Sequence, residues 1–269
     1  MRALAAAHIA VPRPLPSRSG ETFELLELPG LPGRRQVDLF HWIDGHQLGS
    51  VEEGLAAGAD AIGEIYATLG EMAARIHTQA CEWRPPPDFR RHSWDADGLA
   101  GERPFWGRFW ELRALSRGQR QLFTRLRSRV HAELTAFGTT ADRYSLIHAD
   151  LVPENVLING SRPQIIDFDD AGFGWHLFEI ATSLYFIRQE PFYESARAGL
   201  IDGYRRRRTL SDEHLELLPL FLAARGTTYL GWVHTREGEP VARELTPQLI
   251  ELAAAAAEEY LRPQSAWPT

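Results

Sequence analysis

The residues of this sequence that could do chemistry are concentrated near its middle. His148 and Asp150 follow a short apolar run, and Asn155 comes five positions after the aspartate. A second apolar run ends in Asp167. Mg²⁺ prefers oxygen ligands and usually takes one or two of them from the protein. An aspartate that is not used for a metal can act as a general base toward a hydroxyl group. The stretch therefore predicts a metal-assisted reaction at an oxygen nucleophile.

A predicted hairpin explains how these residues could meet. Tyr144 to Ile147 is a short apolar strand, and Val156 to Ile158 and Gln164 to Ile166 are two more β runs. The pair Asn159-Gly160 between the last two is a strong turn signal. Because a hairpin returns the chain to its starting end, we expect the two aspartates and the asparagine at one end of the sheet.

Phosphoryl transfer is the chemistry that this arrangement suits. Asp150 would accept the proton of the attacking hydroxyl and aim it at the γ-phosphate of ATP. Asn155 and Asp167 would hold Mg²⁺ or Mn²⁺, which offsets phosphate charge. Asp169 and Asp170 could reach the metal or the substrate, or one of them could cap the following segment.

Three more polar residues near the motif have weaker expected roles. His148 is expected to be a core histidine that orients the turn. Glu179 is expected to tie the loop to the next helix. Glu154 adds to an acidic surrounding that would suit an amine-bearing acceptor.

The flanking sequence predicts a small β-rich start, residues 1–45, and a large helical body, residues 46–269, with the hairpin in its middle. Residues 22–28 and 36–43 alternate like two strands around a Pro-Gly turn. Ala59 to Cys81 is the best amphipathic helix, and residues 88–103 look like a loop. Other helices are expected at 1–11 (the end of a helix), 105–115, 118–137, 176–188, 191–207, 211–235 and 243–261.

Composition excludes several classes of protein. With 44% apolar and 24% charged residues, the chain resembles an ordinary soluble domain. A net charge of −7 gives no general attraction for nucleic acid. No apolar run approaches a membrane span, so we expect a cytoplasmic protein. The single cysteine, Cys81, cannot form an internal disulfide. All 29 basic residues are arginine, so a mechanism that needs a lysine is excluded for this chain alone.

The motif His148-x-Asp150-x4-Asn155, followed by Asp167-Phe168 after a hairpin, resembles the catalytic loop and metal motif of protein kinases. Its details are closer to the aminoglycoside phosphotransferase and choline kinase-like superfamily. The run Gly174 to Ala181 resembles the start of that family's next helix, with Glu179 in place of aspartate. The helix from Leu69 to His77 also matches, and the resemblance covers roughly residues 8 to 260.

The resemblance implies a kinase-like α+β fold of two lobes, a small partial β N-lobe and a large, mostly helical C-lobe. It also implies a hinge at Phe40, His41, Trp42 and Ile43 that binds adenine through backbone groups. ATP and a small hydroxyl-bearing acceptor are the implied ligands. The acceptor classes are amino alcohols, amino acids, sugars and aminoglycosides.

The sequence departs from the family before residue 22. The Gly-rich loop and the strand lysine that cover the ATP phosphates are missing. Three explanations stay open: a chain that begins late, a catalytically impaired pseudokinase or nucleotide-binding protein, and a minimal lobe that uses arginine for the phosphates. An intact base and intact metal ligands argue against the second.

Two other functions compete with a small-molecule kinase. A bacterial serine/threonine protein kinase would look alike in this lobe. The run Asp167 to Asp170 also loosely resembles the nucleophile motif of haloacid-dehalogenase-like phosphohydrolases, but that chemistry uses a lysine and leaves His148 to Asn155 unexplained.

Several aromatic residues leave a further choice open. They could line a pocket for an amine through cation–π contacts, or they could belong to the core. The residues are Trp106, Trp110, Trp175, Tyr185, Tyr229 and Trp232.

Overall fold

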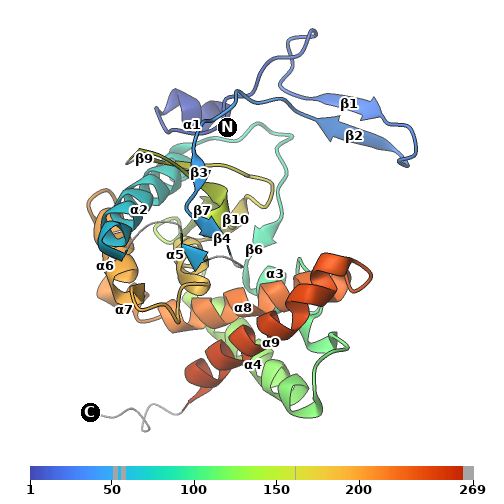
Figure 1. Cartoon of the computed structure of the whole chain (residues 1–269), viewed down its shortest axis with the longest axis vertical. Coiled ribbons are helices and arrows are strands. Elements are labelled where there is room, and N and C mark those ends of the chain that lie inside the picture. Colours follow the sequence, from blue (N-terminus) through green and yellow to red (C-terminus); the bar gives the residue numbers. More distant parts are fainter. Residues whose placement is uncertain (51–53, 56–58, 161, 263–269) are drawn as a thin grey trace.

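The computed structural model describes residues 1–50, 54–55, 59–160 and 162–262. A hairpin of β1 (Glu24–Glu27) and β2 (Arg34–Val37) projects from one end of a mostly helical body (Figure 1). The two strands are antiparallel and joined by a turn in which Gly30 and Gly33 have positive φ. The first of the two predicted strands is therefore confirmed.

The second predicted strand, residues 36–43, is wrong in its later half. β2 ends at Val37, and Phe40 instead forms an isolated antiparallel bridge with Pro14. The chain bends away from β1 there because the segment around Pro14 offers its own backbone groups: Leu15 donates to the Leu39 carbonyl at 2.7 Å.

A three-stranded sheet contains the strand that leads into His148 and Asp150. It has the order β6 (Ser93–Trp94), β10 (Gly172–Trp175), β7 (Tyr144–Ile147), with β10 antiparallel to β7 and parallel to β6. The sequence predicted β7 but not β10, whose glycines hide its strand character. Gly174 is needed because a Cβ there would lie 2.5 Å from the Ile147 side chain.

The hairpin predicted between Asn155 and Asp167 is confirmed as β8 (Val156–Asn159) paired with β9 (Arg162–Ile165). Gly160 has φ 63° in the turn, which suits its glycine. β3 (His46–Gln47) adds to β8 and thereby joins the segment after residue 43 to the hairpin. The remaining short pair is β4 (Gly49–Ser50) with β5 (Gly54–Leu55).

Two predictions between residues 88 and 115 are wrong. The expected loop 88–103 contains β6 and a short helix, α3 (Ala96–Ala100), whose N-cap Asp95 accepts from the Gly98 N–H at 2.8 Å. The expected helix 105–115 is only a 3₁₀ turn, η1 (Phe109–Glu111). Gly107 with φ 108° breaks the helix, and of the aromatic residues there only Phe109 is fully buried.

The other helices follow the predicted pattern within a few residues, with two exceptions: the helix expected over residues 1–11 ends at Ala6, and the expected helix 211–235 is divided before Pro219. Their bounds are α1 (Arg2–Ala6), α2 (Ala59–Glu82), α4 (Arg117–Phe137), α5 (His176–Tyr185), α6 (Tyr193–Arg205), α7 (Asp212–Leu215), α8 (Leu218–Thr235) and α9 (Pro240–Leu261). Helix α4 begins with a capping box between Ser116 and Gln119.

Helices α2 and α6 touch along their backbones, side by side in Figure 1. A Cβ on Gly203 would lie 1.8 Å from the Ala67 carbonyl oxygen, and one on Gly70 would lie 2.1 Å from that of Leu200. Glycine is therefore required at both positions for this close approach.

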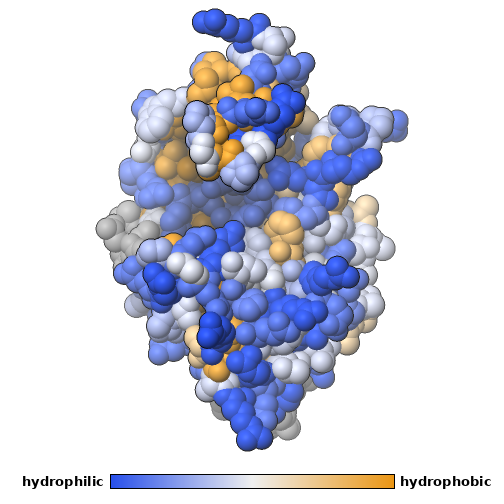
Figure 2. Space-filling model, turned by 90° about the vertical axis from the view of Figure 1, so that its right-hand side faces the viewer, coloured by the Kyte–Doolittle hydropathy of each residue, from blue (hydrophilic) through white to orange (hydrophobic). Residues whose placement is uncertain are grey.

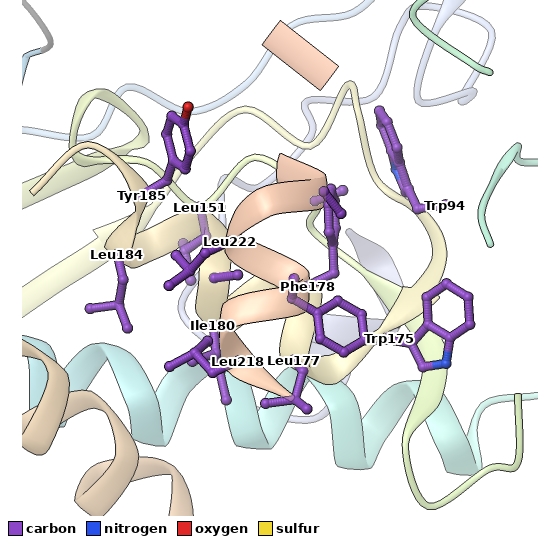
Figure 3. Packing of buried hydrophobic residues seen from close by; sticks show 14 of the residues in the cluster. Trp94, Leu151, Trp175, Leu177, Phe178, Ile180, Leu184, Tyr185, Leu218 and Leu222 are labelled. Atoms are coloured by element: carbon purple, nitrogen blue, oxygen red, sulfur yellow. The ribbon is translucent and has the colours of Figure 1, made fainter. Parts of the chain in front are cut away.

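Helix α5 is buried along its whole length in the centre of the helical body. Figure 3 shows Phe178 and Ile180 of α5 beside Leu218 and Leu222 of α8, with Trp94 and Trp175 at the edge of the same cluster. Since α5 follows β10 directly and α8 packs on it, this core positions the ends of β7 and β10.

The β1–β2 end is unlike the helical body in its surface. Figure 2 shows an apolar patch on the upper part of the molecule. Large apolar side chains are exposed there, among them Phe23, Leu25, Leu26, Val37, Leu39 and Trp42. Among the described residues, no helix is both long and apolar enough to cross a membrane.

Candidate active site

The loop after β7 has a strained backbone that is held by a buried carboxylate of α5. Ala149 has φ 67°, a left-handed conformation that is unfavourable for a residue with a Cβ. Glu179 on α5 accepts the N–H groups of His148 and Ala149 at 2.8 and 2.7 Å, one with each carboxylate oxygen. The Ala149 side chain is fully buried. The loop conformation is therefore set by α5.

The Asp150 carboxylate has a partner on each oxygen. Oδ2 accepts the Asn155 side-chain amide at 2.7 Å, and Oδ1 accepts Nη2 of Arg225 at 2.6 Å. The side chain keeps 23% of its exposure, so it faces open space beside these partners. A carboxylate fixed in this way is an oriented hydrogen-bond acceptor.

Asn155 lies in the 3₁₀ turn η2 (Pro153–Asn155) and is buried. Its amide nitrogen donates to both the carbonyl and the carboxylate of Asp150, at 2.9 and 2.7 Å. The amide oxygen is then the atom left for a cation. Its backbone carbonyl accepts the Ile166 N–H at 3.0 Å, which brings the start of the Asp167 segment to the same place.

Asp167 also has a left-handed backbone, with φ 60°. Its Oδ1 accepts the Asp169 N–H at 3.2 Å. An amide oxygen and a carboxylate on adjacent backbone segments fit the donor set of a hard divalent cation, which takes its other ligands from phosphate and water. Among the described residues, no cluster of three or more His, Cys, Asp or Glu forms an all-protein metal cage.

Asp170 is a titratable group of the same site. Burial, together with the charges of Asp150 and Asp167, raises the pKa of Asp170 to about 6. Its backbone carbonyl accepts the indole N–H of Trp94 at 3.0 Å. Neighbouring Asp169 is held through its carbonyl by Arg91 at 2.7 Å. The backbone of Asp169 and Asp170 is therefore fixed by hydrogen bonds from Arg91 and Trp94.

His148 points into the protein. Its side chain is fully buried, and Nε2 lies 2.9 Å from the Ile166 carbonyl oxygen. It thus links the loop after β7 to the end of the β8–β9 hairpin. Glu154 lies in η2, and its carbonyl accepts the Gln47 side chain at 3.1 Å.

The predicted hinge, Phe40 to Ile43, connects the N-terminal hairpin with β3. The His41 N–H donates to the Arg13 carbonyl at 2.9 Å. Backbone groups alternate in direction along an extended chain, so those of Phe40 and Trp42 face the opposite side. The Trp42 side chain is 88% exposed.

Two contributors to the site, Arg225 and His77, were missed in the sequence, whereas Tyr229 was considered only as part of an aromatic pocket or of the core. Arg225 and Tyr229 lie on α8, and the Arg225 side chain, fully buried, contacts both Ala149 and Asp150. A signal was present: Arg225 is the one Asp, Glu, Lys or Arg in the otherwise apolar run of Leu218–Thr235. His77 on α2 was also missed; its Nε2 lies 3.6 Å from Glu179 Oε1, and its Nδ1 lies 2.9 Å from the Tyr204 hydroxyl.

Comparison with known proteins decides the family. A model described as "phosphotransferase enzyme family" matches residues 1–214. The chain belongs to this family. Among curated proteins, the amicoumacin kinase of Bacillus subtilis (strain 168) is 25% identical over 244 residues, which are 87% of this chain and 67% of that protein. A Deinococcus radiodurans protein is 28% identical over 88% of this chain and 65% of its own length. The chain thus spans about two thirds of these relatives.

Solved structures of small-molecule kinases share the fold. A microcompartment-associated aminopropanol kinase has a TM-score of 0.81 and 29% identity, over 97% of this chain and 78% of that chain. An amicoumacin kinase in complex with AMP-PNP, Ca²⁺ and Ami has a TM-score of 0.73 at 20% identity, over 94% of this chain and 75% of its own. The predicted kinase-like α+β fold is confirmed.

Proposed function

We propose that this protein transfers the γ-phosphoryl group of ATP to a hydroxyl group of a small molecule, in the first place an amino alcohol. The observation that carries the proposal is the Asp150 carboxylate, which is oriented by a partner on each oxygen and adjoins two potential metal ligands. Family membership supports the reaction class. The named relatives include kinases of aminopropanol and amicoumacin.

Asp150 would be the base of this reaction. Each of its oxygens accepts one hydrogen bond and keeps capacity for another. A hydroxyl of the acceptor can therefore donate to the exposed side of the carboxylate, which takes its proton as the oxygen attacks phosphorus.

Asn155 and Asp167 would hold the divalent cation, Mg²⁺ in our proposal. The cation, when bound, supplies charge stabilisation on the phosphate oxygens. The chain presents an amide oxygen and a carboxylate from two backbone segments. These segments are joined by the hydrogen bond from the Ile166 N–H to the Asn155 carbonyl oxygen. Adenine would bind to backbone groups of Phe40 and Trp42.

An amino group on the acceptor suits the surrounding charge. Asp170 has its pKa raised by burial and by neighbouring carboxylates, so a cationic amine nearby would favour its ionised form. Sugars without an amine would lack this contact.

The test is ATP turnover with a panel of amino alcohols, aminoglycosides, neutral sugars and a serine-containing peptide. We expect turnover with an amino alcohol and a loss of about 10²- to 10⁴-fold in Asp150→Asn, the usual size of general-base effects. The matched control is Asp88→Asn, since Asp88 is exposed in a loop. Phosphate transfer to the peptide alone, or equal turnover in Asp150→Asn, would contradict the proposal.

A further inference from the structure

Arg225 is a buried cation in the centre of an apolar helix. Its side chain has no exposed surface, and the rings of Tyr229, Trp106 and Phe178 surround the guanidinium at 4.3, 5.3 and 5.7 Å. Burying a charge is costly unless it is paired and hydrogen-bonded. The position therefore needs a reason beyond packing.

The hydrogen bonds of Arg225 show where its charge is used. Nη2 donates to Asp150 Oδ1 at 2.6 Å and to the Tyr229 hydroxyl at 2.7 Å. Nη1 donates to the Ala149 carbonyl at 3.2 Å. One guanidinium thus donates hydrogen bonds both to the side chain of the proposed base, Asp150, and to the backbone of the strained residue before it, Ala149.

The loop is consequently clamped by two buried charges of opposite sign. Glu179 on α5 accepts the N–H of Ala149, and Arg225 on α8 donates to its carbonyl. Because both sides of this left-handed residue are held, the conformation can persist despite its cost of about 1–2 kcal/mol.

Several of the aromatic residues already contact cations of the chain itself. Trp106 and Tyr229 border Arg225, Trp110 lies against Arg127 at 4.1 Å, and Trp232 lies against Arg236 at 4.8 Å. These rings therefore already have arginine side chains of the chain as cation–π partners, so we expect an acceptor amine to bind the carboxylates instead.

We infer that Arg225 is a positioning residue for phosphoryl transfer, which fixes the orientation of the Asp150 carboxylate from α8 while Asn155 fixes its other oxygen. This inference rests on the proposed function. Orientation matters because a displacement of about 1 Å at a reacting group can cost about 100-fold in rate. The hydrogen bonds of Arg225 go to Ala149, Asp150 and Tyr229 and not to the proposed adenine-binding segment, so its effect should fall on kcat.

The first variant is Arg225→Lys, which keeps the charge but loses the planar fork that reaches Asp150 and Ala149 together. We expect kcat to fall roughly 10- to 100-fold, with an unchanged KM for ATP. The matched control is Arg236→Lys, an arginine at the end of the same helix that also stacks on a tryptophan; its kcat should equal that of the wild type.

A double-mutant cycle separates positioning from a general loss of structure. If Arg225 acts through Asp150, Arg225→Lys should have no further effect on kcat in an Asp150→Asn background, because the two residues act as a unit. An equal loss in both backgrounds would overturn the inference.

Tyr229→Phe gives a second, milder perturbation, since it removes one partner of Nη2 and leaves the ring. We expect a several-fold lower kcat that again vanishes in the Asp150→Asn background. Should Arg225→Lys not fold, as judged by circular dichroism, an unchanged kcat in Tyr229→Phe overturns the inference. If the wild type turns over and a folded Arg225→Lys variant keeps full activity, the inference about Arg225 is overturned and the proposed function stands. A wild type without turnover refutes both the inference and the proposed function.

Discussion

Nη2 of Arg225 lies 2.6 Å from Oδ1 of Asp150, so helix α8 and the loop after β7 meet at an ion pair whose cationic side is fully buried. The residues are 75 positions apart in the chain. This contact ties the proposed base to the helical core instead of leaving it on a free loop.

Replacing the buried carboxylate of Glu179 should destabilise the fold. In Glu179→Gln, one of the two side-chain atoms becomes a donor, so either the His148 or the Ala149 N–H loses its acceptor. An orphaned buried N–H costs about 1–3 kcal/mol. The free energy of unfolding in urea should fall by this amount, while Glu251→Gln, an exposed change on α9, should be close to neutral. Equal stability of both variants would contradict the role of Glu179.

Stability should decline in mild acid because of two stacked histidines. The rings of His77 and His176 lie 4.3 Å apart, and burial lowers the pKa of both below the ordinary value. Below pH about 6.5 the two histidines bind protons in the unfolded chain but not in the folded chain. Stability is therefore present above that pH and lost below it, by about 1.4 kcal/mol per pH unit for each histidine.

The measurement is urea unfolding at several pH values between 7.5 and 5. His77→Gln should reduce the slope of stability against pH, whereas His8→Gln, at an exposed position, should leave the slope unchanged. A flat profile for the wild type would show that the two rings can be protonated in the folded state.

The contact between α2 and α6 should not tolerate a methyl group. In Gly203→Ala the new Cβ would lie 1.8 Å from the Ala67 carbonyl oxygen, so the helices must separate. Overpacking of this kind costs about 1–3 kcal/mol or more. Gly118→Ala is the opposite case: nothing lies within 4 Å of its Cβ in α4, and we expect a gain of about 0.5–1 kcal/mol from helix propensity. Thermal unfolding of the two variants compares them directly.

Removal of a proposed metal ligand should abolish metal-dependent nucleotide binding. In Asp167→Ala, calorimetry with ATP should show binding that no longer responds to Mg²⁺, and the wild type treated with a chelator should behave in the same way. Asp88→Asn again serves as the control. Metal-dependent binding that survives in Asp167→Ala would place the cation elsewhere.

The sequence by itself determined the parts of this protein that depend on local pattern. The turn signal at Asn159-Gly160 sufficed to predict the hairpin, and helical periodicity predicted the amphipathic helices. These features are readable because turn chemistry and helical periodicity act over a few residues. The kinase-like fold was implied by the resemblance of the motif from His148 to Asn155 to a known family.

Tertiary structure alone decided the rest. β10 was hidden because its glycines are chosen for close approach to β7 and β6, not for strand propensity. The 105–115 segment has aromatic residues at a helical spacing, although it forms only a 3₁₀ turn in which Phe109 is buried, while Phe105 is exposed. Arg225 could be recognised in the sequence as an unusual charged residue in a mostly apolar helix, but its partner could not be named. The two residues of the ion pair are 75 positions apart, and they meet only because α8 packs on α5 and brings the guanidinium to the loop after β7.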